Sequence, residues 1–436
     1  MKLNLNKLVY LLALMSPVWT IVACSSEKDD TPVDPNPKFK PVVPIELEAA
    51  EADVSNSITP FCFDLLANTI NVGQRGASTA VSPLSAAMTL GMLANAISTD
   101  DRADLLEALN INESQLPWFN SYAKKLLDQL PEMDNFCPMR IANGAWFTTV
   151  APTGIQPPQL TSSYKSILSE SFMAHINYAD FRQKSTLESI NKWARDMTGL
   201  PHLLDGLSRE KMFVLANAIE FKSTWNYPFD KSLTEKSKFT REDGSEAEVD
   251  MMRGLIWSAD AFYLGEETDD PSDCPRIALL PYGNMAFKMA VMMPSEGMTV
   301  STLIRQLRDG IWEETIRNHV RTSIETPFIG LPRFSILSDI NLVPILQMMG
   351  VDNIFNQCHL QGMSIDGSVS VLKQSLSLDV DEEGTIIRVE TVTDGDLADV
   401  PQAIDQITFD RPFVYVVWEQ STGAILIAGT YMGPDA

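Results

Sequence analysis

The chain has 436 residues, enough for one large domain or two of ordinary size, and 45% of them are hydrophobic, which is typical of a globular protein and excludes a disordered one. Its formal net charge of −24 argues against nucleic acid as a partner and against electrostatic attachment to an anionic membrane. Most of this charge is expected on a solvated acidic surface.

The first 24 residues have the pattern of an export signal. Lys2 and Lys7 precede an apolar run over residues 8–23, which is too short and too close to the N-terminus for a membrane-spanning helix. The run ends in Ile-Val-Ala-Cys, which resembles a bacterial lipobox and implies cleavage before Cys24 and lipidation of its thiol. The alternative is an ordinary signal peptide followed by an incidental cysteine. The acidic residues 25–30 resemble the surface-export signal of some Gram-negative lipoproteins. We therefore expect an exported protein, lipid-anchored to the bacterial outer membrane, on a membrane face that the sequence leaves open.

The rest of the chain divides into a tether and a domain. Residues 24–45 are rich in proline and polar side chains, which predicts an extended tether. We predict a signal peptide over residues 1–23, a lipidated tether over 24–45 and a single domain over 46–436. The domain has four cysteines without a CxxC motif, namely Cys62, Cys137, Cys274 and Cys358. Buried free thiols are favoured in so large a core, but disulfide pairing stays open.

Hydrophobic periodicity predicts an α+β fold, with helices and strands mixed without a regular βαβ alternation. Ser82 and Pro83 have the chemistry of a helix N-cap and a first helical residue, and the apolar run after them predicts a buried helix. Asn217 interrupts a long apolar strand and needs hydrogen-bond partners there. Helices are predicted over residues 60–71, 83–93, 102–109, 121–130, 185–198, 299–308 and 340–349, and strands over 140–150, 213–225, 238–253, 262–264, 276–293, 323–335, 413–418 and 424–430.

The stretch over residues 374–393 has an unusual pattern. Residues 374–380 alternate with a period of two, which predicts a strand with one buried face. After Glu382, Glu383 and Gly384, a second run over residues 385–393 is β-branched and contains no proline. No two-residue hairpin turn joins the two runs. One interpretation is that the second run has the sequence of a strand but forms a loop that can become a strand later.

The same stretch matches the ligand spacing of an EF-hand calcium loop. The matching residues are Asp379, Asp381, Glu383, Gly384, Ile386 and Glu390. An EF-hand requires a helix on each side, whereas both flanks here have the periodicity of strands. We therefore predict no calcium site, and no other metal or cofactor.

Motifs of the common enzyme classes are missing from the sequence. The four histidines form no HExxH pair, and there is no GxSxG elbow and no phosphate-binding loop with a lysine. A dispersed catalytic triad is still compatible with the sequence, but a protein that is not an enzyme is favoured.

Taken in chain order, seven motifs resemble the serpin family over roughly residues 57–434. They are VSPLSAAMTLGML at residues 81–93, NAIEFKSTW at 217–225, LPYGN at 280–284, VMMPSEG at 291–297, LPRFSI at 331–336, DEEGT at 381–385 and FDRPFVYVVWEQSTGAILIAGTYMGP at 409–434. Each motif alone is weak, whereas their order and spacing are specific. The resemblance implies a serpin-like α+β domain with three β-sheets, about eight or nine helices and an exposed reactive-centre loop.

The resemblance also implies a function, that of an endopeptidase inhibitor. Serpins offer the loop to a protease, which forms an acyl-enzyme, and the cleaved loop then inserts into the main sheet and distorts the protease. By resemblance, the inserted segment is residues 385–398. The implied hinge is Glu382, Glu383, Gly384 and Thr385; the polar cluster where the sheet opens is Ser82, Ser85, Asn217 and Gln374; and insertion starts beside Trp225, Arg333 and Glu382, with the last two paired.

The family's usual spacing from Gly384 places the cleaved bond between Ala398 and Asp399. The loop is longer than in many members, so the range extends from Leu397 to Pro401. A small residue before the bond favours elastase-like or subtilisin-like serine proteases, or papain-like cysteine proteases. The expected partners are these proteases, in a covalent acyl-enzyme complex, and a membrane through the lipid on Cys24 only. No nucleic acid is expected, and the protein is expected to be a monomer.

Two features depart from inhibitory serpins. Gln374 stands where many members have histidine, and bulky residues follow Thr385 where small ones are usual. With Thr385 facing inward, Ile387 and Val389 also face inward, and overpacking there would cost roughly 1–3 kcal/mol and slow insertion. An inhibitor is favoured, and the alternative is a non-inhibitory serpin-fold binding protein at the cell surface.

Overall fold

The computed structural model describes residues 39–74, 76–199, 203–265, 274–321, 326–369, 372–385 and 406–434. Phe39–Ala436 is one compact unit. The described end of the predicted tether packs on it, because Phe39 lies edge-on against Phe136 with ring centroids 4.8 Å apart, and the buried Ile45 donates its N–H to Ser421 Oγ at 2.9 Å. The predicted signal peptide, Cys24 and loop residues 386–405 lie outside the described residues. No helix in the described ranges is long and apolar enough to cross a bilayer.

The helices begin and end largely where capping residues predict. Ser82 caps α3 as expected, since its Oγ accepts the Ser85 N–H at 3.3 Å, and the helix is buried on nearly all sides. Gly199 ends α7 in the left-handed conformation, with φ +72°. The α-helices are α1 (Ala49–Ser57), α2 (Thr59–Val72), α3 (Pro83–Ala94), α4 (Ala103–Ala108), α5 (Leu116–Gln129), α6 (Ser162–Ser166), α7 (Lys184–Thr198), α8 (Val300–Gln306), α9 (Leu342–Met348) and α10 (Asn353–Asn356).

A six-stranded sheet lies within the hydrophobic core. Its order is β1-β19-β18-β10-β9-β8, and its two C-terminal strands are buried at every residue. These strands are largely apolar because both of their faces are covered, with Glu419 and Thr430 as buried polar exceptions. The bounds are β1 (Thr79–Val81), β8 (Asp260–Tyr263), β9 (Arg276–Pro281), β10 (Phe287–Met293), β18 (Phe413–Glu419) and β19 (Ile425–Tyr431).

Two further groups of strands complete the main architecture. A four-stranded sheet has the order β17-β11-β7-β6, with β6 (Asp230–Thr240), β7 (Glu246–Leu255), β11 (Phe328–Pro332) and β17 (Gln406–Thr408). The third sheet consists of two ladders. One is β3-β2-β4, with β2 (Met139–Thr148), β3 (His175–Ala179) and β4 (Phe213–Phe221), and the other is β12-β15-β16-β5, with β5 (Ser223–Thr224), β12 (Phe334–Asn341), β15 (Lys373–Val380) and β16 (Gly384–Thr385). A small hairpin pairs β13 (Cys358–Leu360) with β14 (Ile365–Gly367).

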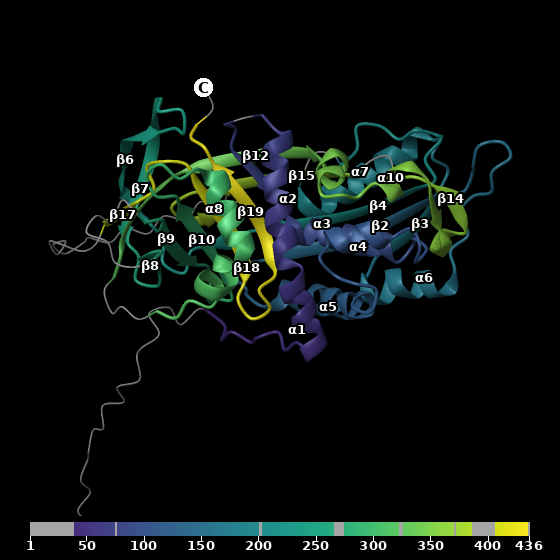
Figure 1. Cartoon of the computed structure of the whole chain (residues 1–436), viewed down its shortest axis with the longest axis horizontal. Helices are drawn as coiled ribbons and strands as arrows, with labels where there is room; N and C mark the ends of the chain where they lie inside the picture. The colour runs from purple at the N-terminus through teal and green to yellow at the C-terminus, as the bar shows by residue number, and fades with distance from the viewer. Residues whose placement is uncertain are drawn as a thin grey trace, which may run out of the picture. The chain divides into compact units, whose positions relative to one another are not determined.

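The split third sheet is covered on both faces. Helix α3 packs against the inner face of β4. Helix α7 packs on the outer face through a cluster of Trp146, Phe181, Ile190 and Ala216. Figure 1 shows β4, β2 and β3 side by side on the right, and β18 and β19 nearer the left, with α2 between the two groups.

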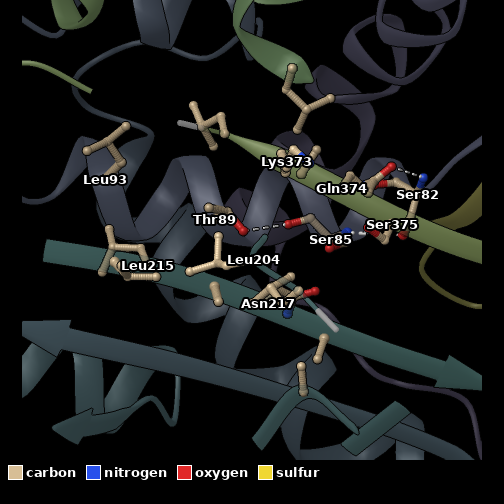
Figure 2. Close-up of a pocket in the computed structure, with 18 of the residues that line it drawn as sticks. Ser82, Ser85, Thr89, Leu93, Leu204, Leu215, Asn217, Lys373, Gln374 and Ser375 are labelled. Atoms are coloured by element: carbon tan, nitrogen blue, oxygen red, sulfur yellow. Dashed lines mark hydrogen bonds between the residues drawn. The ribbon is translucent and has the colours of Figure 1, made fainter. Parts of the chain in front are cut away.

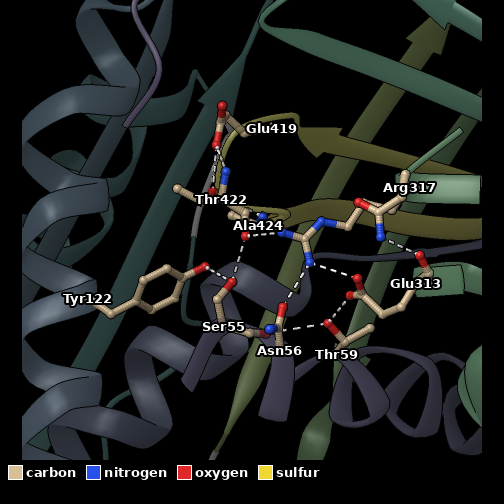
Figure 3. Close-up of polar contacts among 10 residues, drawn as sticks. Ser55, Asn56, Thr59, Tyr122, Glu313, Arg317, Glu419, Thr422 and Ala424 are labelled. Carbon is tan, nitrogen blue, oxygen red and sulfur yellow. Dashed lines mark hydrogen bonds and ion pairs between the residues drawn. The ribbon is translucent and has the colours of Figure 1, made fainter. Parts of the chain in front are cut away.

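A polar network fastens the N-terminal helices to the C-terminal hairpin (Figure 3). The Thr422 carbonyl accepts hydrogen bonds from Ser55 Oγ at 2.7 Å and from Arg317 Nη2 at 2.9 Å. Arg317 also forms an ion pair with Glu313, and the wholly buried Glu419 accepts the Thr422 N–H at 2.8 Å. Because these residues come from distant parts of the chain, they hold together elements on which the six-stranded sheet depends.

The predicted α+β fold class is confirmed, with two main sheets and a third that is divided. One prediction was wrong in detail. The single strand expected over residues 323–335 is two strands in different sheets. Residues 328–332 pair with β7, and the Arg333 N–H extends this pairing by donating to Asp250 O of β7 at 2.8 Å, whereas Phe334–Asn341 pair with β15. Residues 322–325 lie outside the described ranges. All four cysteines of the domain are buried, and Cys62, Cys137 and Cys358 are free thiols, as favoured.

Candidate functional site

A tight turn follows β15 and returns the chain into the third sheet. The Asp381 side chain closes it, since its Oδ1 accepts the N–H groups of Glu383 at 2.9 Å and Gly384 at 3.2 Å. Beyond the turn, Thr385 pairs with Val380 of β15 on one side and Ser223 of β5 on the other. Thr385, the first residue of the second predicted strand, therefore already belongs to the sheet. The flanks of the turn are strands and not the helices of an EF-hand.

Gly384 lies against the backbone of β5. Its φ of +154° is a conformation that residues with a side chain rarely adopt. A Cβ at this position would stand 2.1 Å from the Ser223 carbonyl oxygen and 2.7 Å from Thr224 Cα. Since both contacts are with backbone atoms, only glycine lets the hinge pair this closely with β5.

Thr385 and Trp225 lie together at the hinge end of the third sheet. Thr385 faces inward, as predicted, with 4% of its surface exposed, and its Oγ1 is 2.6 Å from the hydroxyl of Tyr282. The Trp225 ring stacks on Tyr282 at a centroid distance of 4.4 Å and an interplanar angle of 8°. Trp225 also donates its Nε1–H to Asp381 O at 2.9 Å and its backbone N–H to Glu383 O at 2.8 Å. Trp225 thus binds the backbone of the hinge turn directly.

Two ion pairs hold the acidic hinge. Arg333 pairs with Glu382, which also accepts a hydrogen bond from Thr234 Oγ1 at 2.7 Å, and Lys231 pairs with Glu383. Burial by itself raises the pKa of Glu382, but the hydrogen bonds from Arg333 and Thr234 outweigh it and bring that pKa below its ordinary value of 4.5. The pKa of Asp381 is raised, mainly because burial disfavours its charged form.

Replacing Glu382 with glutamine is expected to lower the thermal midpoint at neutral pH. Because the folded-state pKa of Glu382 is depressed, its contribution to stability is complete above about pH 4.5 and is lost as the pH falls through that depressed value. The difference between wild type and variant should therefore shrink in acid, which thermal melts across pH will measure. The control is Glu246→Gln, whose ion pair with Lys238 is exposed and should contribute little. A Glu382→Gln effect that is independent of pH would contradict the prediction.

A groove of about 570 Å³ separates β4 from β15 (Figure 2). Its walls are Phe213–Phe221 and residues 373–379, and the side chains of α3, among them Ser85 and Thr89, form its floor. Within the described residues no ladder joins β4 to β15, so the groove is a gap in the sheet. At its hinge end the gap is one strand wide, and β16 occupies it there. We call it the sheet groove.

The structure brings the four residues of the predicted polar cluster to the sheet groove, in two separate sets. Gln374 Oε1 accepts the Ser82 N–H at 2.8 Å, and Gln374 Nε2 donates to Ser82 O at 2.9 Å. Ser85 follows Ser82 on α3. On the other wall, Asn217 donates to Asn143 Oδ1 at 2.9 Å, and its own Oδ1 is buried without a hydrogen-bond partner among the described residues.

Replacing Gln374 with leucine is expected to lower the free energy of unfolding by about 1–3 kcal/mol, because the buried Ser82 N–H loses its acceptor, while the Ser82 carbonyl keeps its bond from the Ala86 N–H. Ser377→Ala, at an exposed position of the same strand, should change it by less than about 0.5 kcal/mol. Chemical denaturation of both variants measures the difference, and equal effects would contradict the prediction.

Several contact residues were not predicted from the sequence. Tyr282, Thr234, Lys231 and Asn143 each contact the hinge or the cluster, yet no local pattern distinguishes them. The predicted bond between Ala398 and Asp399, with its range from Leu397 to Pro401, lies outside the described residues, as does the lipidation site at Cys24.

Comparisons with known proteins agree with this architecture. A sequence model of the family described as "Serpin (serine protease inhibitor)" matches residues 56–434. A serine protease inhibitor from Cyanea capillata is 28% identical over 81% of this chain and 92% of its own, and Iripin-3 from Ixodes ricinus is 29% identical over 80% and 87%. Among solved structures, the thermophilic serpin tengpin in its native state has a TM-score of 0.73 at 23% identity, covering 91% of this chain and 97% of its own. With the family match extending over nearly the whole described fold, the chain belongs to the serpin family.

Proposed function

We propose that this protein inhibits endopeptidases as a suicide substrate, by inserting residues 385–398 into the sheet groove after its loop is cleaved. The hinge carries the proposal. Gly384 and Thr385 already occupy the first positions of an additional strand, paired with β15 on one side and β5 on the other. The sheet groove continues from these positions between β15 and β4.

The chemistry is supplied by the protease. Its serine or cysteine attacks the carbonyl carbon of the residue before the cleaved bond and loses its proton to the enzyme's base. The new ester or thioester bond forms as the peptide C–N bond breaks, and the following residue leaves as an amine that takes up the proton held by the enzyme's base. Insertion then moves the attached enzyme before water hydrolyses the acyl bond, so the complex persists.

The expected energy of insertion is large enough for this task. An added strand gains hydrogen bonds to both walls of the sheet groove, each worth roughly 1 kcal/mol net, so insertion of residues 385–398 releases on the order of 10 kcal/mol. Ordinary folded domains are stable by about 5–15 kcal/mol. The free energy released on insertion is therefore comparable with the folding stability of a domain, and is large enough to disorder a protease active site.

We place the cleaved bond between Ala398 and Asp399, within the range from Leu397 to Pro401. Elastase-like and subtilisin-like serine proteases and papain-like cysteine proteases accept a small residue before the bond, whereas Asp396 and Asp399 disfavour trypsin-like enzymes. These assignments are supported by the sequence and by the spacing typical of serpins.

We further propose that the protein is exported and anchored to the bacterial outer membrane by lipid on Cys24, as a monomer. The support is the charged and apolar N-terminal segment that ends in a lipobox-like sequence. Cys24→Ser should move the full-length protein from the membrane fraction to the soluble one, and a variant that stays with the membrane would overturn the lipid anchor.

The inhibitory function is tested by incubating the purified protein with elastase, subtilisin, papain and trypsin. Denaturing gels should show a covalent complex with at least one of the first three, and mass spectrometry should find a released fragment that begins near Asp399. Clean cleavage with fully active protease, and no rise in thermal stability, would instead favour a non-inhibitory binding protein at the cell surface. The bulky residues after Thr385 are the feature that favours this alternative.

A further inference from the structure

The edge strand β6 has a bulge where it contacts the hinge. Its ladder with β7 shifts register between Asp230 and Glu235, an interval in which β6 advances by five residues and β7 by only two. Asp230 shapes this bulge, because its Oδ1 accepts both the N–H and the hydroxyl of Ser232, at 2.8 and 2.7 Å. Bulges re-aim side chains and are common next to functional sites. The side chains of residues 231–234 can therefore point away from the regular ladder.

Two side chains of the bulge bind the hinge. Lys231 forms an ion pair with Glu383, and Thr234 Oγ1 donates to Glu382 Oε1 at 2.7 Å. Just before the bulge, the Phe229 N–H donates to the Glu382 carbonyl at 2.9 Å. The bulge thus connects the four-stranded sheet to the hinge of the third sheet. The family resemblance predicted the pairing of Glu382 with a basic residue, but it assigned no partner to Glu383.

Lys231 balances part of a crowded acidic turn. The turn has three consecutive carboxylates, those of Asp381, Glu382 and Glu383, and like charges this close repel one another. Arg333 pairs with Glu382, and Lys231 is the ion-pair partner of Glu383 within the described residues. The hydrogen bond to Glu383 raises the pKa of Lys231, and the charges of Asp381 and Glu382 act in the same direction. Removing Lys231 would leave Glu383 to repel its two neighbours, which favours opening of the turn.

We infer that Lys231 is a positioning residue for inhibition: its charge keeps the hinge turn closed, so that insertion is faster than hydrolysis of the acyl-enzyme. The inference rests on the function proposed above. The closed turn already holds Thr385 in the sheet, so an inserting strand does not have to order its first residues. When the turn opens, insertion slows. Water then adds to the acyl carbon, and the protease leaves active while the cleaved chain keeps a new carboxylate.

The first test measures how much inhibitor is cleaved for each covalent complex formed, on denaturing gels, with a protease that the wild type traps. Lys231→Met should raise this ratio about two- to fivefold, the size of effect that a partly exposed ion pair supplies, and Lys231→Arg should restore it. Lys238→Met is the matched control, because Lys238 lies on the same strand, is 61% exposed against 64% for Lys231, and pairs with Glu246 away from the hinge. The control should leave the ratio unchanged, and both methionine variants should melt within about 2 °C of the wild type. Equal ratios for the two methionine variants would contradict the role of Lys231.

The second test addresses the physical cause. If the unbalanced charge of Glu383 opens the turn, adding Glu383→Gln to Lys231→Met should return the ratio toward the wild-type value. A double variant no better than Lys231→Met would rule that cause out.

Hydrogen exchange separates this inference from the proposed function. The N–H groups of Glu383 and Gly384, which bind Asp381 Oδ1 in the closed turn, should exchange about two- to fivefold faster in Lys231→Met than in the wild type or in Lys238→Met. A wild type that forms no complex with any protease would refute the inhibitory function and the effect of Lys231 on it. Unchanged exchange in Lys231→Met, with complexes still formed by the wild type, would refute the closure of the turn alone.

Discussion

Replacing Gly384 with alanine is expected to abolish most of the stability that the protein gains when its loop is cleaved. The added Cβ would lie 2.1 Å from the Ser223 carbonyl oxygen, a backbone atom that cannot move without breaking the pairing of β5. The inserting strand could therefore not pair with β5 at its first residue, and the residues after it would lose their register with the sheet. In the wild type, an insertion worth on the order of 10 kcal/mol corresponds to a rise in melting temperature on the order of 10 °C.

The measurement is the melting temperature of wild type and Gly384→Ala before and after loop cleavage, together with the yield of covalent complex. Gly244→Ala is a matched control, since Gly244 also has a positive φ, of +83°, but a Cβ there would meet nothing within 4 Å. The control should lose some stability from backbone strain alone and still gain stability on cleavage. A Gly384→Ala protein that gains as much as the wild type would show that the close contact with β5 does not govern insertion.

Replacing Trp225 with alanine is expected to lower the free energy of unfolding by about 3–5 kcal/mol, because a large buried aromatic side chain is removed. The loss includes the stacking on Tyr282 and the hydrogen bond from Nε1 to Asp381 O. Trp225→Phe keeps an aromatic ring and loses the N–H donor, so it should cost less, with about 1 kcal/mol attributable to the hydrogen bond.

Denaturant titration of the two variants separates the packing contribution from the hydrogen bond. Trp257→Ala provides the control, because 60% of the Trp257 side chain is exposed and its removal should change stability by less than about 0.5 kcal/mol. If Trp225→Ala were no more destabilising than Trp257→Ala, the stacked pair would not hold the top of the sheet.

The local structure of this protein could be predicted from its sequence. Alternation over residues 374–380 predicted β15 and its buried face, and Ser82 with Pro83 predicted the start of α3. Both follow from interactions within a few residues, namely the period of side-chain direction and the capping of free N–H groups. The order of the motifs predicted the family, and with it the α+β fold and the pairing of Arg333 with Glu382.

The construction of the site, by contrast, depends on contacts that form only in the folded chain. Tyr282 beneath Thr385, Thr234 beside Glu382 and Asn143 beside Asn217 come from segments far away in the chain, and no local pattern marks a contact at such a separation. The split between β11 and β12 also depended on pairing across the fold, because β11 pairs with β7 whereas β12 pairs with β15. The gap between β4 and β15 is likewise a property of two strands brought together by packing on α3, so its position and the unused acceptor of Asn217 became visible only in three dimensions.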